Sequence, residues 1–325
     1  MNQPLRIWVL ADDRAGNVAQ GLGVAEALGR PFETKDIRYS PLARLPNALQ
    51  GATRLGVTPE TRLALTPPWP DVVIAAGRRT APVGRWIKRQ NPNAFLVQIM
   101  NPGRVGADEF DFVAIPAHDC ELPSGDAPNV MRTTGAPHRV TPVRLAAARD
   151  VWTPRFANLP RPLMALIVGG ATNRKPFPMP LATKLGKDAA KMAKEAGGSV
   201  LLTTSRRTGA DAEQALLAAI PEPRFVFTWG NTGENPYMGF LALADAIIVT
   251  GDSVSMCSEA CATSAPVYIF SPDDMVAAKH GRLHTALYEQ GFARALDGRF
   301  ETWTHPPLNA AHDIARAIES KLKAR

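Results

Sequence analysis

The chain has 325 residues, of which 45% are hydrophobic and 21% are charged, a composition typical of folded globular proteins. Its length favours two domains over a single core. The formal net charge of +7 favours anionic partners such as phosphorylated metabolites or an anionic lipid surface. No basic run is interleaved with aromatic residues, which argues against a nucleic-acid partner.

No apolar run approaches the roughly 20 residues of a membrane-spanning helix. Residues 1–6 lack the basic and then apolar pattern of a signal peptide. We therefore expect a cytoplasmic protein.

The first half of the chain alternates strand and helix patterns. Strands are expected over Leu5–Leu10, Phe32–Ile37, Val72–Ala76, Phe95–Met100, Phe110–Ile115 and Val130–Thr133, with helices over Asn17–Leu28 and Thr80–Gln90. Such alternation favours a parallel sheet covered by helices on both faces.

A proline-rich stretch from Pro137 to Pro162, containing the expected helix Val143–Trp152, separates this half from a second alternating half. Strands are expected there over Leu163–Val168, Ser199–Thr203, Arg224–Phe227, Ala246–Thr250 and Val267–Phe270, and a last helix over Leu308–Lys323. The sequence thus predicts two doubly wound Rossmann-like domains, residues 1–155 and 156–305. Residues 306–325 are expected to form a C-terminal helix that packs back on the first domain.

Ligands of doubly wound sheets bind beyond the carboxyl ends of the strands. The first such loop, Asp12–Asn17, lacks the G-x-G-x-x-G spacing of a dinucleotide site, which disfavours a nicotinamide-dependent oxidoreductase. One of the adjacent carboxylates Asp12 and Asp13 can act as a general base, or the two can bind a cation. The alternative is a loop that caps the helix and leaves both carboxylates in solvent.

Two further loops of the first half carry candidate residues. Arg78 and Arg79 follow the strand Val72–Ala76 at the start of a helix, where paired arginines favour a bound anion over a solvated face, and Thr80 can cap that helix. His118 is a candidate acid or base, although it and Asp119 point opposite ways if that segment is extended.

The second half contains three strand ends that suit a phosphate group. Glycine turns and hydroxyl-rich helix starts expose backbone amides to anions. The residues are Gly169, Gly170 and Thr172; Ser205, Arg206, Arg207 and Thr208; and Gly251, Asp252, Ser253 and Ser255, of which the last three can also cap a helix. A diphosphate group fits these loops together.

Metal ligation is not expected. Cys257 and Cys261 lie four residues apart, but Cys120 is the one further cysteine, so we interpret them as small buried residues in a reducing compartment. His280 and His284 lack the glutamate of a H-E-x-x-H site.

A segment of mixed leucines and arginines, Leu42–Gln50 with Arg54 and Leu55, can rest on an anionic membrane surface. Pro46 interrupts any long amphipathic helix there, which favours a solvated loop and helix. The sequence also lacks a P-loop and a G-x-S-x-G elbow.

The second domain resembles the nucleotide-sugar-binding half of GT-B glycosyltransferases, notably the bacterial enzymes that make the peptidoglycan lipid precursor. The resemblance rests on the Gly169–Thr172 turn and on a signature of Asp245, Ile247–Val249, Gly251, Ser253–Ser255, Glu259 and Pro266–Tyr268. It implies a GT-B-like α/β fold with two domains facing across a cleft, and it implies that Glu259 binds the ribose hydroxyls of a uridine nucleotide. Asp252 stands where many of these enzymes have a small residue.

Nearly the whole chain resembles the "elongated mitochondria" family of mitochondrial-fission proteins and its bacterial relatives. The stretches are Gly16–Asn17, Gln20–Leu22, Pro68–Asp71, Ala76–Arg79, Gly135–Arg139, Thr203–Thr208, Asn235–Tyr237 and Thr250–Met256. The resemblance implies a glycosyltransferase-like activity, although a fold alone does not determine function.

The leading hypothesis is a glycosyltransferase that uses a nucleotide-diphosphate sugar, preferably a UDP sugar, as substrate and needs no cofactor. Asn235 and Tyr237 would lie near the base or sugar, and Asn17, Gln20, Arg78 and Arg79 on the acceptor side, with Asp13 or His118 as the base. The alternative is a catalytically inert GT-B scaffold that binds a membrane or a partner protein.

Overall fold

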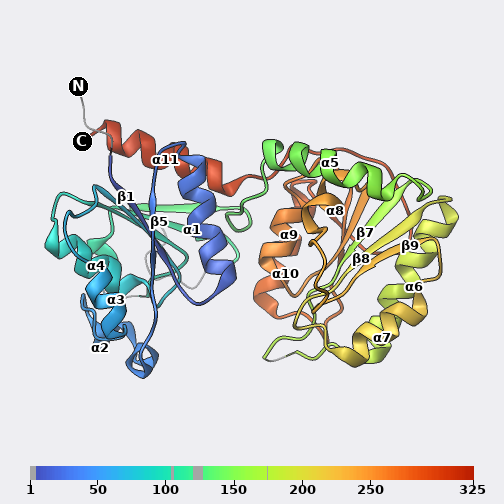
Figure 1. The fold of residues 1–325 in the computed structure, drawn as a ribbon, viewed down its shortest axis with the longest axis horizontal. Helices are drawn as coiled ribbons and strands as arrows, with labels where there is room; N and C mark the ends of the chain where they lie inside the picture. The colour runs from blue at the N-terminus through green and yellow to red at the C-terminus, as the bar shows by residue number, and fades with distance from the viewer. Residues whose placement is uncertain (1–4, 104–105, 120–126, 174) are drawn as a thin grey trace. The chain divides into compact units, whose positions relative to one another are not determined.

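The computed structural model describes residues 5–103, 106–119, 127–173 and 175–325, and Cys120 lies outside them. The chain divides into two compact units (Figure 1). Unit 1 comprises residues 1–139 and 309–325, and unit 2 comprises residues 140–308. Each unit contains one six-stranded sheet.

The sheet of unit 1 is parallel throughout and has the order β2-β1-β3-β4-β5-β6. Its strands are β1 (Ile7–Ala11), β2 (Glu33–Asp36), β3 (Val72–Ala76), β4 (Phe95–Ile99), β5 (Phe112–Pro116) and β6 (Val130–Thr133). β1, β3, β4 and β5 are buried along their whole length, which explains their uninterrupted apolar sequences.

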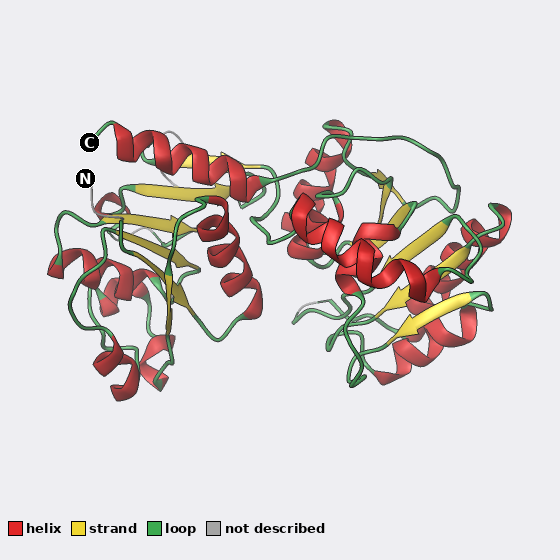
Figure 2. Cartoon of the chain, turned by 45° about the horizontal axis from the view of Figure 1, so that its top comes forward, coloured by secondary structure: helices red, strands yellow, loops and turns green. Residues whose placement is uncertain are grey.

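Helices cover both faces of this sheet (Figure 2). On one face, α1 (Ala15–Ala27) packs beside α11 (Ala310–Lys323), which places Ile314 and Ile318 in the same core as Val9 and Ile74. On the other face lies α4 (Ala81–Gln90). The short elements of the unit are η1 (Pro41–Arg44), α2 (Asn47–Gln50), α3 (Pro59–Ala64) and η2 (Ala107–Glu109).

The sheet of unit 2 is also parallel and has the order β12-β11-β10-β7-β8-β9. Its strands are β7 (Leu163–Ile167), β8 (Ser199–Thr203), β9 (Arg224–Phe227), β10 (Ala246–Thr250), β11 (Val267–Phe270) and β12 (Arg294–Ala295). The chain enters at β7, fills the sheet on one side through β8 and β9, and then returns to the other side of β7 with β10.

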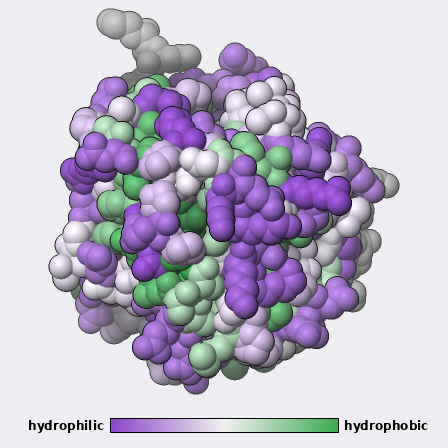
Figure 3. Space-filling model, turned by 90° about the vertical axis from the view of Figure 1, so that its right-hand side faces the viewer, coloured by the Kyte–Doolittle hydropathy of each residue, from purple (hydrophilic) through white to green (hydrophobic). Residues whose placement is uncertain are grey.

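The two faces of the unit 2 sheet have separate cores. One contains residues of α5 (Pro142–Phe156), α8 (Tyr237–Leu243), α9 (Val254–Ala260) and α10 (Ala278–Glu289), and the other contains residues of α6 (Met179–Glu195) and α7 (Ala210–Ala219). Hydrophilic side chains dominate the side of unit 2 seen in Figure 3, with hydrophobic ones between them.

These findings confirm the predicted fold class of two parallel, doubly wound α/β sheets. The units divide after Arg139, whereas the sequence suggested a division near residue 155. The reason is that α5 packs in unit 2, where Trp152 and Phe156 join the core beside Phe240. Among the described residues, no helix is both long enough and apolar enough to cross a membrane.

Candidate functional site

The sheet of unit 2 reverses its strand order between β7 and β10, which is therefore its topological switch point. Open α/β sheets bind ligands beyond the carboxyl ends of the strands at such a point. The loop after β7 begins at Val168 and contains Gly169 and Gly170, and the loop after β10 contains Gly251 and Asp252. Both predicted glycine turns thus flank the switch point.

Hydrogen bonds join these loops to each other and to the loop after β8. The Gly169 amide donates to the Thr250 hydroxyl oxygen at 2.7 Å, and the Thr208 hydroxyl donates to the Gly169 carbonyl at 2.9 Å. The Ser205 hydroxyl donates to the same carbonyl. Three loops that are far apart in the sequence therefore form one surface.

Glycine is required where these loops touch. Gly170 has a φ of +123°, and a Cβ there would lie 2.3 Å from the carbonyl oxygen of Arg207. A Cβ on Gly169 would lie 2.4 Å from Oδ2 of Asp252, and one on Gly251 would lie 2.5 Å from Cε1 of His284. A side chain at Gly169 or Gly170 would push these loops apart, and a side chain at Gly251 would push its turn away from α10.

The two adjacent arginines after β8 have different surroundings. Arg207 forms an ion pair with Asp252, whose side chain is 0% exposed, and donates to the Ala171 carbonyl at 3.2 Å. Oδ1 of Asp252 is buried and has no hydrogen-bond partner in the described part of the chain. Arg206 is exposed and makes no hydrogen bond or ion pair with a described residue. Arg207 thus joins the loops, while Arg206 is open to a ligand.

The start of α9 agrees in part with the expected capping. The Ser253 hydroxyl accepts a hydrogen bond from the Met256 amide at 3.4 Å, so Ser253 is the cap. Asp252 does not cap the helix, because its carboxylate is turned toward Arg207. Ser255 is half-buried in the first turn, and Thr172 forms an isolated bridge with Lys175.

Tyr237 and Glu259 form a second group in unit 2. The Tyr237 hydroxyl donates to Oε2 of Glu259, while its amide donates to Oδ1 of the exposed Asn235 at 2.9 Å. Burial raises the pKa of Glu259, and the hydrogen bond from Tyr237 opposes that rise. The pKa of Tyr237 is raised by burial and by the negative charge of Glu259. The structure therefore brings these predicted residues together.

Unit 1 has its switch point between β1 and β3, and several acceptor-side residues gather there. Arg79 forms an ion pair with Asp13, lies 3.7 Å from the buried Asp12, and stacks over the ring of Tyr39 at 4.3 Å. Asn17 donates to Oδ2 of Asp12 at 2.8 Å. A charged network thus joins the loops after β1 and β3.

The other predicted residues of this region make structural contacts. Arg78 donates to Oδ1 of Asn47 at 3.1 Å. Gln20 is buried with its amide nitrogen 4.0 Å from the Met100 sulfur. Thr80 does not cap α4 with its side chain, because its hydroxyl donates to the carbonyls of Ala76 and Gly77.

His118 is not brought together with Asp13. It is buried and follows β5, which β4 separates from β3 in the sheet. The sequence also did not indicate a contact between His284 and the Gly251 turn, where Nε2 lies 3.0 Å from the Gly251 carbonyl oxygen. No local signal could have shown this contact, since the two residues belong to different segments of the chain.

Cys257 and Cys261 of unit 2 are both buried. The Sγ atom of Cys257 lies 3.8 Å from the Thr250 carbonyl oxygen, and the Sγ atom of Cys261 lies 3.9 Å from the Phe292 carbonyl oxygen. Burial raises the pKa of both thiols. The described residues contain no group of three or more His, Cys, Asp or Glu side chains placed to hold a metal ion.

Solved structures with a similar architecture include the putative UDP-N-acetylglucosamine 2-epimerase of Listeria monocytogenes, with a TM-score of 0.58, 13% identity and coverage of 99% of this chain and 98% of that one. The UDP-GlcNAc 2-epimerase of Neisseria meningitidis bound to UDP-GlcNAc gives a TM-score of 0.54 at 11% identity, with 99% and 100% covered. The glycosyltransferase SnogD of Streptomyces nogalater gives 0.50 at 14% identity, with 99% and 95% covered. These likenesses confirm the GT-B-like fold.

Sequence comparison gives the family. The chain is 29% identical over 353 residues to an uncharacterized protein of Rickettsia prowazekii, covering 98% of this chain and 99% of that protein. It is 34% identical over 279 residues to the mitochondrial fission protein ELM1 of Arabidopsis thaliana, covering 79% of this chain but only 65% of the plant protein. The model of the family described as mitochondrial fission ELM1 matches residues 15–322. The chain therefore belongs to the mitochondrial fission ELM1 family.

Proposed function

We propose that unit 2 binds a nucleotide-diphosphate sugar, preferably a UDP sugar, and that the protein transfers the sugar to an acceptor. The observation that carries the proposal is the joining of three strand-end loops at the switch point of unit 2, with Arg206 exposed beside them. The names of the epimerases of similar fold, which include one bound to UDP-GlcNAc, support a nucleotide-sugar ligand.

The diphosphate would lie on the surface formed by these loops. Gly169, Ser205 and Thr208 would shape this surface through the hydrogen bonds that join the loops. The amides of Gly170 and Asp252 and the hydroxyls of Thr172, Ser253 and Ser255, which donate to no residue that the structure describes, would donate to the diphosphate oxygens, and the guanidinium of Arg206 would neutralise part of its charge. Preorganised donors of this kind stabilise a departing diphosphate. The proposed reaction therefore needs no cofactor.

The nucleoside would lie against Tyr237 and Glu259. Because Tyr237 donates to Oε2 of Glu259, it fixes the orientation of the carboxylate. The other carboxylate oxygen would accept a ribose hydroxyl, and the exposed Asn235 would lie near the base or sugar. In this proposal Tyr237 positions Glu259, and Glu259 contacts the ligand.

Unit 1 would bind the acceptor through the charged loops at its own switch point. Asp13 is the favoured base, because its side chain is 57% exposed and lies at that point, whereas His118 is buried beyond β4. A carboxylate at this place can accept the proton of an acceptor hydroxyl. Arg79, already paired with Asp13, would orient the carboxylate.

Calorimetry with UDP and UDP-GlcNAc tests the donor site. Wild type is expected to bind both, and Glu259→Ala is expected to weaken binding by roughly ten-fold or more, since a hydrogen bond to a charged group contributes about 1.5–3 kcal/mol. Glu195→Ala is the matched control, because Glu195 ends α6 and, among the residues that the structure describes, forms an ion pair only with Lys191 on the surface. No binding by wild type, or equal binding by Glu259→Ala, would reject the assignment.

A second candidate function is binding to an anionic membrane surface as a GT-B scaffold, and one feature of unit 1 supports it. Residues 41–64 expose four large hydrophobic side chains, Leu42 at 43%, Leu49 at 70%, Leu55 at 41% and Leu63 at 79%. The same segment contains Arg44, Arg54 and Arg62. Exposed leucines with arginines suit a lipid interface.

Sedimentation with vesicles containing anionic lipid tests this second function. Wild type is expected to sediment, and Leu49→Asp with Leu63→Asp is expected to remain in solution because each change places a charge in the lipid-facing segment. The control Val143→Asp changes an equally exposed residue, at 78%, in unit 2. Vesicle binding that is retained in Glu259→Ala would separate this function from nucleotide binding, and equal sedimentation of the double variant would contradict it.

A further inference from the structure

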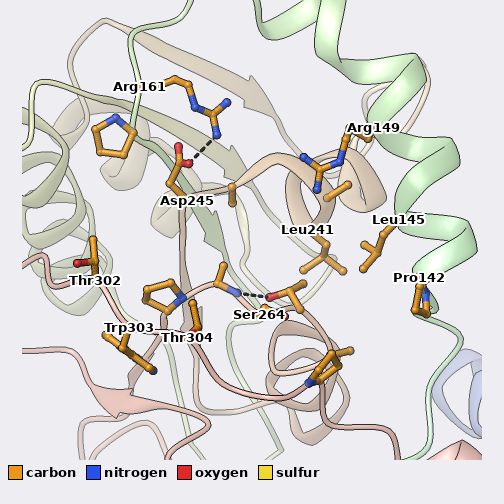
Figure 4. A pocket seen from close by; sticks show the side chains of 18 of the residues that line it. Pro142, Leu145, Arg149, Arg161, Leu241, Asp245, Ser264, Thr302, Trp303 and Thr304 are labelled. Carbon is orange, nitrogen blue, oxygen red and sulfur yellow. Dashed lines mark hydrogen bonds and ion pairs between the residues drawn. The ribbon is translucent and has the colours of Figure 1, made fainter.

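A pocket of about 860 Å³ opens at the amino-terminal edge of the unit 2 sheet (Figure 4). Pro162, Asp245 and Pro266 line it, and each immediately precedes a strand, β7, β10 or β11. The two ends of a parallel strand lie at opposite edges of its sheet. The pocket therefore lies at the opposite edge of the sheet from the glycine turns and does not belong to the proposed nucleotide site.

The wall of the pocket is largely apolar and is held in place by packing. Leu145 of α5, Leu241 of α8 and Trp303 line it. The Trp303 ring packs edge-on against Tyr268 at 5.1 Å, and the guanidinium of Arg294 stacks over it at 4.2 Å. The volume falls within the range of about 300–1,000 Å³ that is typical of small-molecule sites.

The charges around the pocket leave one cation without a counter-ion. Arg161 is neutralised by its ion pair with Asp245 and also donates to the Leu243 carbonyl. The guanidinium of Arg149 makes no hydrogen bond or ion pair with any residue that the structure describes, and Figure 4 shows its side chain extending from α5 at the pocket. An anion bound there would gain charge-assisted hydrogen bonds next to an apolar wall.

We propose that this pocket binds a small molecule with an apolar chain and a single anionic head group. The head group contacts Arg149, and the chain lies against Leu145, Leu241 and Trp303. Burial of the chain supplies most of the affinity, in proportion to the apolar area removed from water. The single unpaired arginine selects an anion over a neutral molecule of the same shape.

Calorimetry on the full chain with octanoate and octanol tests the selectivity, because the two probes share a similar chain and differ in charge. Octanoate is expected to bind roughly ten-fold tighter than octanol, because its carboxylate can accept charge-assisted hydrogen bonds from Arg149. Arg149→Gln is expected to abolish that difference and leave octanol affinity unchanged. Arg144→Gln is the matched control, since it removes the same charge from α5 outside the pocket lining.

A second variant tests the location. Ser264→Trp adds bulk at an exposed lining residue and is expected to weaken the binding of both octanoate and octanol. Its melting temperature is measured to show that the variant folds. Saturating UDP is expected to leave octanoate binding unchanged, which keeps this result separate from that of the nucleotide site. The proposal is overturned if neither probe binds, if wild type binds both equally, or if folded Ser264→Trp binds as wild type does.

Discussion

At the scale of single residues, the site of unit 2 separates positioning from ligand contact. Arg207 and Asp252 form an ion pair that joins two strand-end loops, whereas the neighbouring Arg206 is exposed. Tyr237 and Glu259 have the same two roles: the tyrosine hydroxyl positions one carboxylate oxygen of Glu259, and the other oxygen is proposed to contact the ligand. Each pair permits a test that distinguishes loss of affinity from loss of stability.

Alanine substitutions of the two arginines are expected to change different properties, UDP affinity at Arg206 and stability at Arg207. Arg206→Ala should weaken UDP binding roughly ten-fold and leave the melting temperature unchanged, because it removes an exposed charge. Arg207→Ala should lower the free energy of unfolding by about 1–3 kcal/mol, since it leaves the buried Asp252 carboxylate unpaired. Calorimetry and denaturant unfolding measure the two quantities.

A rescue variant provides the control for this pair. Adding Asp252→Asn to Arg207→Ala should recover part of the lost stability, because a neutral amide is less costly to bury than a carboxylate. Additive losses in the double variant would show that the two side chains do not act as a pair.

Glu259→Gln is expected to stabilise the unliganded protein near pH 7 while weakening UDP binding. Burial raises the pKa of Glu259 in the folded state above the unfolded value near 4.5, so ionisation costs stability as the pH rises through that interval. The gain in melting temperature should therefore shrink as the pH falls toward 4.5. Thermal scans across pH measure it, and a gain that grows on acidification would contradict the burial argument.

At the scale of elements, the loop after β7 depends on close backbone approach. Gly170→Ala should destabilise the protein and weaken UDP binding, because its Cβ would meet the Arg207 carbonyl oxygen at 2.3 Å and push two loops apart. Gly197→Ala is the matched control: its φ is +71°, but no atom lies within 4 Å of the added Cβ. UDP affinity should fall only in Gly170→Ala, and an equal fall in both variants would implicate backbone strain alone.

Much of each sheet could be predicted because parallel strands buried on both faces have continuous apolar sequences. Ala246–Thr250 and Val72–Ala76 have the predicted bounds for this reason. β12 has two exposed residues and no apolar run, so no pattern indicated it. The unit to which α5 belongs depends on contacts between Trp152 and residues near Gly239, which are distant in the sequence.

The candidate site was predictable to a smaller extent. Glycines and hydroxyls after strands indicated which loops to consider, and the parallel topology brought those loops to one edge of the sheet. The sequence could not distinguish Arg206 from Arg207, because the difference arises from Asp252 in another loop. It also offered Asp13 or His118 as the base without information on the order of the strands between them.

At the scale of the whole molecule, the C-terminal helix completes unit 1 although it follows unit 2 in the chain. Ile318→Ala should lower the free energy of unfolding by about 2–5 kcal/mol, because the side chain is 0% exposed in the core that α11 shares with α1. UDP binding by unit 2 should remain unchanged at temperatures where the variant is folded. Ser320→Ala, an exposed change in the same helix, should alter neither quantity.

The central claim is that unit 2 binds a nucleotide diphosphate on the loops after β7, β8 and β10. Hydrogen exchange measured by mass spectrometry with and without UDP tests it most directly, because bound phosphate oxygens slow exchange of the amides that donate to them. We predict protection in residues 169–172, 205–208 and 251–259 of unit 2. Protection confined to other segments, or none at saturating UDP, would contradict the account.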